Sequence, residues 1–334
     1  MKNSYVLMLT HSQDKYVPDI IERALKFYNL TMVRMNTDDY PLNINLTASL
    51  TNSRASGEIV VDGKNYQLDQ FCAVYFRKNM QANLTSELCG NLLKQATKEA
   101  TAAKNAILYA LESVFWFDCP FAIQRAENKQ LQLILAKQSG LTIPRSLLTN
   151  DPSLVEKFYH AEQGNIVSKM LTPISNFMHS ARSFVYTSKV KQEHLTKLDS
   201  LKLCPMQFQE EINKLYELRV IYVDGKFFTG KISSDAITDE NKPDWRRAHK
   251  NQCFWQHYEL PESVCIKINK LMNKLTLNFG ALDLIKSTQG EYVFLEVNPC
   301  GEWGMLEKDL ALPIAKSIAD CINKQITQGT EHAA

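Results

Sequence analysis

The sequence predicts an α/β protein made of α+β lobes. Its N-terminal region alternates strand, helix and strand, which is typical of a parallel βαβ unit. Its C-terminal half carries Asp-Gly between two apolar runs, which indicates an antiparallel hairpin. The chain has 334 residues, enough for two or three lobes rather than one small domain.

The first domain is expected to span residues 1–120. Apolar runs at Tyr5–Thr10 and Leu30–Asn36 predict two strands. The spacing of Ile20, Ile21 and Leu25 predicts a helix between them. The further expected elements are a hairpin turning at Asp62-Gly63, a strand at Ala73–Lys78 and a helix over Thr85–Leu111. The segment "FDCPF" then interrupts the helical pattern, and the domain boundary is placed there.

A central domain over 121–204 and a C-terminal domain over 205–334 are expected to follow. "AENKQLQLILAKQSG" predicts a helix that ends before Gly140. One face of this helix is expected to carry Leu131, Ile134, Leu135 and Gln138. The remaining expected elements are a strand at Gly164–Leu171 with its partner at Ala181–Val190, a strand in "MQFQEEI", a hairpin over Glu217–Ile232 turning at Asp224-Gly225, and helices over Ser263–Asn278 and Leu312–Ile326.

Composition excludes several classes of function. Charge is nearly balanced, with 38 Lys+Arg against 36 Asp+Glu and no long run of one sign, so neither a nucleic-acid surface nor an anionic-membrane surface is indicated. No apolar stretch approaches the roughly 20 residues of a membrane span. The 8 cysteines form no CxxC pair, which argues against a structural zinc site. Without an export signal, a cytoplasmic location is expected.

Carboxylates interrupt two apolar strands near the C-terminus. Alternation along "YVFLEVN" predicts that Phe294, Glu296 and Asn298 share one face. If this strand pairs with "GALDLI" through the turn near Gln289-Gly290, then Asp283 lies beside Glu296. Two carboxylates and an amide oxygen are hard donors of the kind that Mg²⁺ prefers, and an unpaired charge on a buried face is costly. We therefore predict a metal site at Asp283, Glu296 and Asn298, against the alternative that each carboxylate is merely salt-bridged.

Cations interrupt other predicted elements. Lys169 lies in the strand "IVSKML", and Lys129 lies at the start of a helix, where the backbone dipole also favours an anion. Arg219 interrupts "ELRVIYV", and Arg246 lies in "KPDWRRAHK". Each alone is more often an ordinary surface residue. Together with the acidic set, they indicate the cationic half of a nucleoside-triphosphate site, although GxxxxGK[ST] and GxGxxG are both absent.

This arrangement resembles the ATP-grasp superfamily, in which two α+β lobes clamp ATP. The resemblance implies that Lys129 and Lys169 contact the phosphates and that Asp283, Glu296 and Asn298 bind Mg²⁺, with two ions expected. It implies further roles for Gln209, Glu211 and Ile212 at adenine, for Glu217 at the ribose, and for Arg219 and Arg246 at the phosphate or acyl phosphate. It also implies an ATP-grasp fold with an N-terminal βαβ pre-ATP-grasp domain.

Six motifs in order resemble more closely the ligases that crosslink microviridins and other graspetides. They are "ENKQLQL", "CPMQFQEEI", "ELRV", "DWR", "GALDLI" and "FLEVNPCGEWGMLE", and the first domain adds "THSQDKY", "RMNTDDYP" and "AVYFRK". "GEWGMLE" resembles the lactam-forming branch. The resemblance implies activation of Asp or Glu side chains of a ribosomal precursor peptide as acyl phosphates, ω-amide or ω-ester crosslinks, and release of ADP. It also implies a leader segment docked on the central domain near "SFVYTSKV", and a homodimer.

Several points stay open in the sequence. "TPISNFMHSARS" lacks the glycines that many ATP-grasp enzymes carry over the phosphates, so its role there is in doubt. Glu302 and Glu307 are candidates for a general base, with a plain surface role as the alternative, and Cys300 is not nominated as a nucleophile. An ATP-grasp ligase that adds amino acids or glutamate to a protein or peptide, and a regulatory ATP-binding protein without catalysis, are the competing functions.

Overall fold

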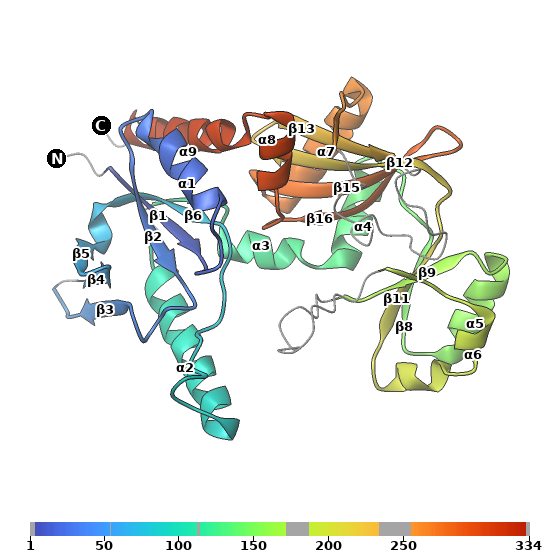
Figure 1. Ribbon diagram of the computed structural model, residues 1–334, viewed down its shortest axis with the longest axis horizontal. Helices are drawn as coiled ribbons and strands as arrows, with labels where there is room; N and C mark the ends of the chain where they lie inside the picture. The colour runs from blue at the N-terminus through green and yellow to red at the C-terminus, as the bar shows by residue number, and fades with distance from the viewer. Residues whose placement is uncertain (1–3, 54, 112–113, 172–186, 234–254, 332–334) are drawn as a thin grey trace.

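The chain folds into three lobes, each built on its own main sheet (Figure 1). The computed structural model describes residues 4–53, 55–111, 114–171, 187–233 and 255–331. The N-terminal lobe lies at one end, the C-terminal sheet joins it, and the central lobe projects from the far side of that sheet (Figure 1). The predicted α/β class with α+β lobes is confirmed.

The N-terminal lobe contains the predicted βαβ unit. Its parallel sheet has the order β2-β1-β6-β7, and Tyr5 pairs with Thr31 in parallel register. Its elements are β1 (Tyr5–Thr10), α1 (Val17–Lys26), β2 (Thr31–Asn36), β6 (Phe71–Phe76), α2 (Gly90–Leu108) and β7 (Phe115–Phe117). A side sheet comprises β3 (Asn45–Leu50), β4 (Ala55–Val61) and β5 (Lys64–Gln67), followed by η1 (Leu68–Gln70). The predicted turn at Asp62-Gly63 joins β4 to β5, with positive φ at both residues.

The central lobe is an antiparallel sheet covered on one face by helices. Its elements are β8 (Ser146–Thr149), α5 (Pro152–Ala161), β9 (Ile166–Lys169), β10 (Ser188–Lys189), α6 (Gln192–Leu195), η3 (Leu198–Lys202) and β11 (Met206–Glu210), with strand order β10-β9-β11-β8. Helix α5 was not among the expected elements, although Asp151 caps it and Pro152 starts it. Because β11 pairs with both β8 and β9, we propose that this domain extends past residue 204 to Glu210.

The C-terminal lobe is a five-stranded antiparallel sheet of order β14-β13-β12-β15-β16. Its elements are β12 (Lys214–Val223), β13 (Lys226–Ser233), β14 (Gln256–His257), α7 (Glu262–Leu275), β15 (Phe279–Ser287), β16 (Tyr292–Asn298), α8 (Gly304–Leu310) and α9 (Ile314–Glu331). The predicted hairpin is confirmed, since Asp224 and Gly225 both have positive φ.

Two helices from the middle of the sequence belong to this C-terminal lobe by packing. They are α3 (Pro120–Ala126) and α4 (Lys129–Gln138), and both contribute to an apolar core with α7 and the sheet. The predicted face of α4 is only partly the buried one: Leu135 is buried and Leu131 packs against the core, but Ile134 is 51% exposed, and the remaining buried residues are Gln132, Leu133 and Ala136. The expected face therefore did not include Gln132.

A β-bulge in β16 corrects a second expectation. Asp283 pairs with Glu296, but the next pair is Leu284 with Phe294, so Leu295 is an extra residue in the strand. Phe294 therefore packs in the apolar core with Val297 instead of sharing the face of Glu296. Because of the bulge, Phe294 and Val297 face the apolar core, while Glu296 and Asn298 lie on the opposite face.

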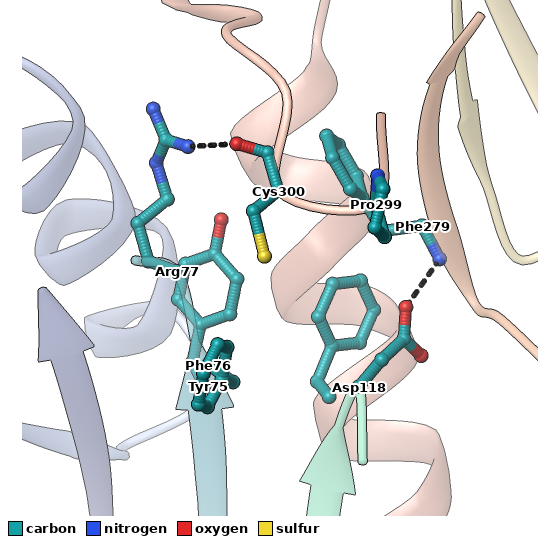
Figure 2. Close-up of a pocket in the computed structure, with 8 residues that line it drawn as sticks. Tyr75, Phe76, Arg77, Asp118, Phe279, Pro299 and Cys300 are labelled. Carbon is teal, nitrogen blue, oxygen red and sulfur yellow. Dashed lines mark hydrogen bonds between the residues drawn. The ribbon is translucent and has the colours of Figure 1, made fainter. Parts of the chain in front are cut away.

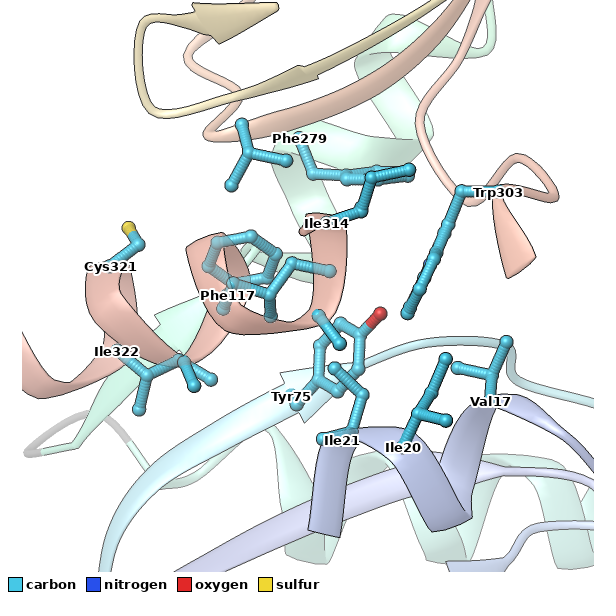
Figure 3. Close-up of a cluster of buried hydrophobic side chains, with 14 of the residues drawn as sticks. Val17, Ile20, Ile21, Tyr75, Phe117, Phe279, Trp303, Ile314, Cys321 and Ile322 are labelled. Atoms are coloured by element: carbon cyan, nitrogen blue, oxygen red, sulfur yellow. The ribbon is translucent and has the colours of Figure 1, made fainter. Parts of the chain in front are cut away.

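The N-terminal and C-terminal lobes share one hydrophobic core (Figure 3). Ile21 of α1 and Tyr75 of β6 pack in the same cluster as Phe279 of β15, Trp303 and Ile318 of α9. Trp303 is fully buried there and follows directly after the loop that leaves β16. The central lobe has a separate core, drawn from residues 147–208.

Candidate active site

One face of the C-terminal sheet carries the polar residues singled out in the sequence. On the opposite face of this sheet, Leu218 and Val220 of β12 and Leu282 and Leu284 of β15 pack in an apolar core. Alternation therefore places the intervening side chains on the other face. These are Glu217, Arg219, Asp283, Glu296 and Asn298.

Each carboxylate of the predicted metal set is paired with a cation. Arg219 Nη1 donates to Asp283 Oδ1 at 2.7 Å, and the two residues are register partners across β12 and β15. Lys129 Nζ lies 3.0 Å from Glu296 Oε2. Both carboxylate side chains are 13% exposed. Pairing offsets the cost of burying these charges, and the arrangement places two anions and two cations side by side.

Lys129 also connects the two lobes that would enclose a nucleotide. Its Nζ donates to the carbonyl of Met170 at 3.4 Å, directly after Lys169 in β9. Lys169 lies on the face of the central sheet opposite Phe208, which packs in the central core. The structure therefore brings the two predicted phosphate lysines to the same junction, one from each lobe.

The segment proposed for adenine and ribose is described, and its side chains have protein partners. Gln209 Nε2 donates to Ser146 Oγ at 2.9 Å, and Glu211 Oε2 lies 2.7 Å from Lys189 Nζ. Ile212 is half-buried in the connection from β11 to β12. Glu217 accepts from Lys214 Nζ at 2.5 Å and lies two residues from Arg219 on β12.

Three further expectations lie wholly or partly outside the described residues. The segment "SFVYTSKV", expected to dock the leader, is described only from Thr187 onward. Arg246 belongs to the stretch 234–254, and the loop "TPISNFMHSARS" belongs to the stretch 172–186. Their roles at the phosphates stay predictions.

The donors on this face fit Mg²⁺ by their chemistry. Asp283 and Glu296 are direct partners in the β15–β16 register, and Asn298 lies two residues further along β16 on the same face. All three offer oxygen, the donor that Mg²⁺ selects over nitrogen or sulfur. Arg219 Nε is buried without a hydrogen-bond partner, so this face holds a polar group that the described protein atoms leave unsatisfied.

The loop after β16 is anchored to the N-terminal lobe by Arg77 (Figure 2). Arg77 is 2% exposed, and its Nη1 donates to the carbonyls of Cys300 and Gly301 at 3.2 and 3.3 Å. A Cβ at Gly301 would lie 2.3 Å from the Cβ of Ala281, so only glycine lets the loop fold back against β15 here. A cavity of about 10 Å³, the size of one water, lies between Arg77, Cys300 and Asp118 (Figure 2).

Glu302 and Glu307, the two candidates for a general base, both have partners within the protein, and the Glu302 side chain is 50% exposed. Glu302 accepts from Arg77 Nη2 at 2.5 Å and also pairs with Lys78. Burial raises its pKa, but the two cations outweigh burial and lower the pKa overall. Glu307 accepts from the N–H of Ala315 at 2.7 Å and so caps the start of α9. Burial raises the pKa of the Cys300 thiol to about 12, which keeps it protonated.

Comparison with known proteins identifies the family. The model described as the MvdD pre-ATP grasp domain matches residues 5–124. The structure of macrocyclase MdnB from Microcystis aeruginosa MRC matches with a TM-score of 0.82 and 39% sequence identity, covering 96% of this chain and 99% of that one. The chain belongs to the graspetide family of ATP-grasp ligases.

Other graspetide ligases match over a similar length. Macrocyclase MdnC from the same strain, solved with precursor peptide MdnA, has a TM-score of 0.85 and 30% identity over 95% of this chain and 99% of that one. A RiPP-associated ligase from Chryseobacterium gregarium, solved with ADP and a leader and core peptide, has a TM-score of 0.88 and 28% identity over 96% and 97%. No curated protein sequence matches the chain. Within the described residues, no helix is long and apolar enough to cross a bilayer.

Proposed function

We propose that this ATP-grasp ligase crosslinks a ribosomal precursor peptide through its acidic side chains. The paired charges on the C-terminal sheet, Arg219 with Asp283 and Lys129 with Glu296, carry the proposal. MdnB and MdnC are macrocyclases, and MdnC was solved with its precursor peptide. ATP-grasp ligases of the same fold were solved with ADP and with Mg²⁺ plus ADP, which supports ATP and Mg²⁺ as cofactors.

The proposed reaction has two steps. A carboxylate of the peptide attacks the γ-phosphorus of ATP, the bond to the β-phosphate oxygen breaks, and ADP leaves. An amine or hydroxyl of the same peptide then attacks the acyl carbon, and inorganic phosphate leaves with the electron pair. A Lys acceptor must lose its extra proton first, because its ordinary pKa is about 10.4. Placing both side chains of one peptide is chiefly a matter of orientation.

The site residues have separate roles in this proposal. Lys129 and Lys169 bind the phosphates, while Gln209, Glu211, Ile212 and Glu217 border the adenine and ribose. Asp283, Glu296 and Asn298 hold Mg²⁺, with two ions expected, and the metal would neutralise charge on the transferred phosphoryl group. Arg219 lies among these ligands and would stabilise the acyl phosphate, a role that Arg246 would share.

The deciding experiment is incubation of the enzyme with ATP, Mg²⁺ and the candidate precursor, followed by mass spectrometry and nucleotide analysis. Each crosslink should remove the mass of one water and release one ADP. Mild base opens esters before amides and so separates the two products. AMP in place of ADP would contradict the acyl-phosphate route. Addition of free glutamate to the peptide would instead support an amino-acid ligase.

A further inference from the structure

Strand β16, which carries two of the proposed metal ligands, is the edge strand of the described sheet. One side of it pairs with β15, and the bulge at Leu295 interrupts that pairing just before Glu296. An edge strand with a bulge needs support from outside the sheet, because its free backbone groups are otherwise unpaired. At Phe294 the carbonyl of Thr142 supplies this support at 2.8 Å.

At Val297 the side chain of Gln132 makes the backbone hydrogen bonds that a neighbouring strand would otherwise make. Gln132 Oε1 accepts from the N–H of Val297 at 2.9 Å, and Gln132 Nε2 donates to the carbonyl of Val297 at 2.8 Å. The same Nε2 donates to the carbonyl of Ala126 at 2.6 Å, so both of its N–H groups are engaged. Gln132 is 2% exposed, and these bonds are therefore shielded from water.

The two peptide units that Gln132 binds are those that carry the ligands. The N–H of Val297 belongs to the unit that joins it to Glu296, and the carbonyl of Val297 belongs to the unit that joins it to Asn298. One side-chain amide thus fixes both peptide planes between the two ligands. Rotation of either plane would move the side chain of a proposed ligand relative to its register partners on β15.

The same residue also fixes the phosphate lysine. Gln132 lies one turn after Lys129 on α4, and Lys129 Nζ lies 3.0 Å from Glu296 Oε2. Helix and strand are therefore joined at two adjacent points, Lys129 to Glu296 and Gln132 to Val297. A shift of α4 along β16 would break both contacts together.

We propose that Gln132 is a positioning residue that holds Glu296 and Asn298 in register with Lys129. The inference rests on the proposed function, because it assumes that these residues bind metal and nucleotide. It assigns Gln132 no contact with substrate. Residues of this kind change metal affinity by about 10- to 100-fold when they are replaced in other metal sites.

The test compares Gln132→Met with Gln138→Met, the same substitution at an exposed position of the same helix. Binding of Mn²⁺ in the presence of ADP is measured by electron paramagnetic resonance, and unfolding is followed without ligand. Gln132→Met should weaken Mn²⁺ binding by about tenfold or more in the folded protein. Gln138→Met should bind Mn²⁺ as the wild type does, and the KM for peptide should stay unchanged in both variants.

A second variant keeps the test decisive. Gln132→Glu retains an acceptor for the Val297 N–H but places an oxygen against the carbonyl of Val297, so it should fold and also bind Mn²⁺ more weakly. A folded variant at position 132 with wild-type Mn²⁺ binding overturns the inference, as does failure of both variants to fold. Absence of Mn²⁺ binding by the wild-type protein with ADP would instead refute the proposed metal site, and the inference with it.

Discussion

Glu296 is the residue on which the candidate site depends most. Its carboxylate is the register partner of Asp283 and the ion-pair partner of Lys129, so it joins the metal donors to the phosphate cations. Glu296→Gln keeps the shape of the side chain and removes the charge. We expect crosslinking to fall by about 100-fold or more, because the change removes charge at the proposed phosphoryl-transfer site.

The folded state should survive this change, since a glutamine still accepts from Lys129. Crosslinked product by mass spectrometry and the midpoint of thermal unfolding provide the two measurements. Glu291→Gln, an exposed position just before the same strand, is the matched control and should retain full activity. Normal turnover by Glu296→Gln would refute the metal assignment.

At the scale of elements, a buried aspartate joins the end of β7 to the start of β15. Asp118 is 2% exposed and accepts from the backbone N–H of Asn278 at 2.7 Å and from that of Phe279 at 2.9 Å, the second of which is drawn in Figure 2. Burial raises its pKa from 3.8 to about 6, although these hydrogen bonds oppose the rise. The carboxyl is therefore protonated more readily in the folded chain than in the unfolded chain.

This shift predicts a dependence of stability on pH. Between pH 4 and 6 the folded state holds a proton that the unfolded state has lost, so raising the pH through this window lowers stability. The loss should be on the order of 3 kcal/mol, since each pKa unit corresponds to about 1.4 kcal/mol. The test is to measure thermal unfolding of the wild type and of Asp118→Asn from pH 4 to 7. All other groups titrate in both proteins, so the difference between the two curves reports Asp118 alone. Parallel curves for the two proteins would contradict it.

Elements differ in how far the sequence predicts them. The pairing of Asp283 with Glu296 was predictable, because a Gln-Gly turn lay between two apolar runs. The bulge at Leu295 was not, because it has no glycine or proline to signal it, and so Phe294 was placed on the wrong face. Gln132 was missed for a related reason: a buried amide is recognised only once the backbone groups that need it are known.

The sequence also could not show which lobes share a core. The motifs fix the order of the segments, whereas packing between Ile21 and Trp303 depends on contacts across the length of the chain. Glu302 illustrates the consequence. In the sequence it is a carboxylate near the metal strand, but in the structure it lies between Arg77 and Lys78 of the N-terminal lobe. Its closeness in sequence to the proposed ligands suggested a catalytic role. Its ion pairs with Arg77 and Lys78 instead indicate that it holds the C-terminal lobe against the N-terminal lobe.

This contact between lobes gives a prediction for the whole molecule. Glu302→Gln should lower the midpoint of thermal unfolding, because Arg77 is 2% exposed and loses the nearer of its two carboxylate partners, keeping only Asp14 at 3.8 Å. It should leave kcat and its pH profile nearly unchanged, whereas loss of a general base lowers rates by about 10²- to 10⁴-fold. Lys78→Met removes the more exposed partner and should destabilise less. A large fall in kcat without loss of stability would restore Glu302 as a base.

The separate core of the central lobe has a mechanical consequence. The N-terminal and C-terminal lobes share a core, whereas the central lobe has its own core and is connected to them through two short joints, residues 143–145 and 211–213. Arg145 in one joint binds Glu210 beside the other, at 2.9 Å through its N–H and 2.8 Å through Nε. The second joint contains Glu211 and Ile212, the residues proposed to border adenine. A nucleotide bound there would contact the connection between the lobes directly, so we expect its binding to favour one orientation of the central lobe over others.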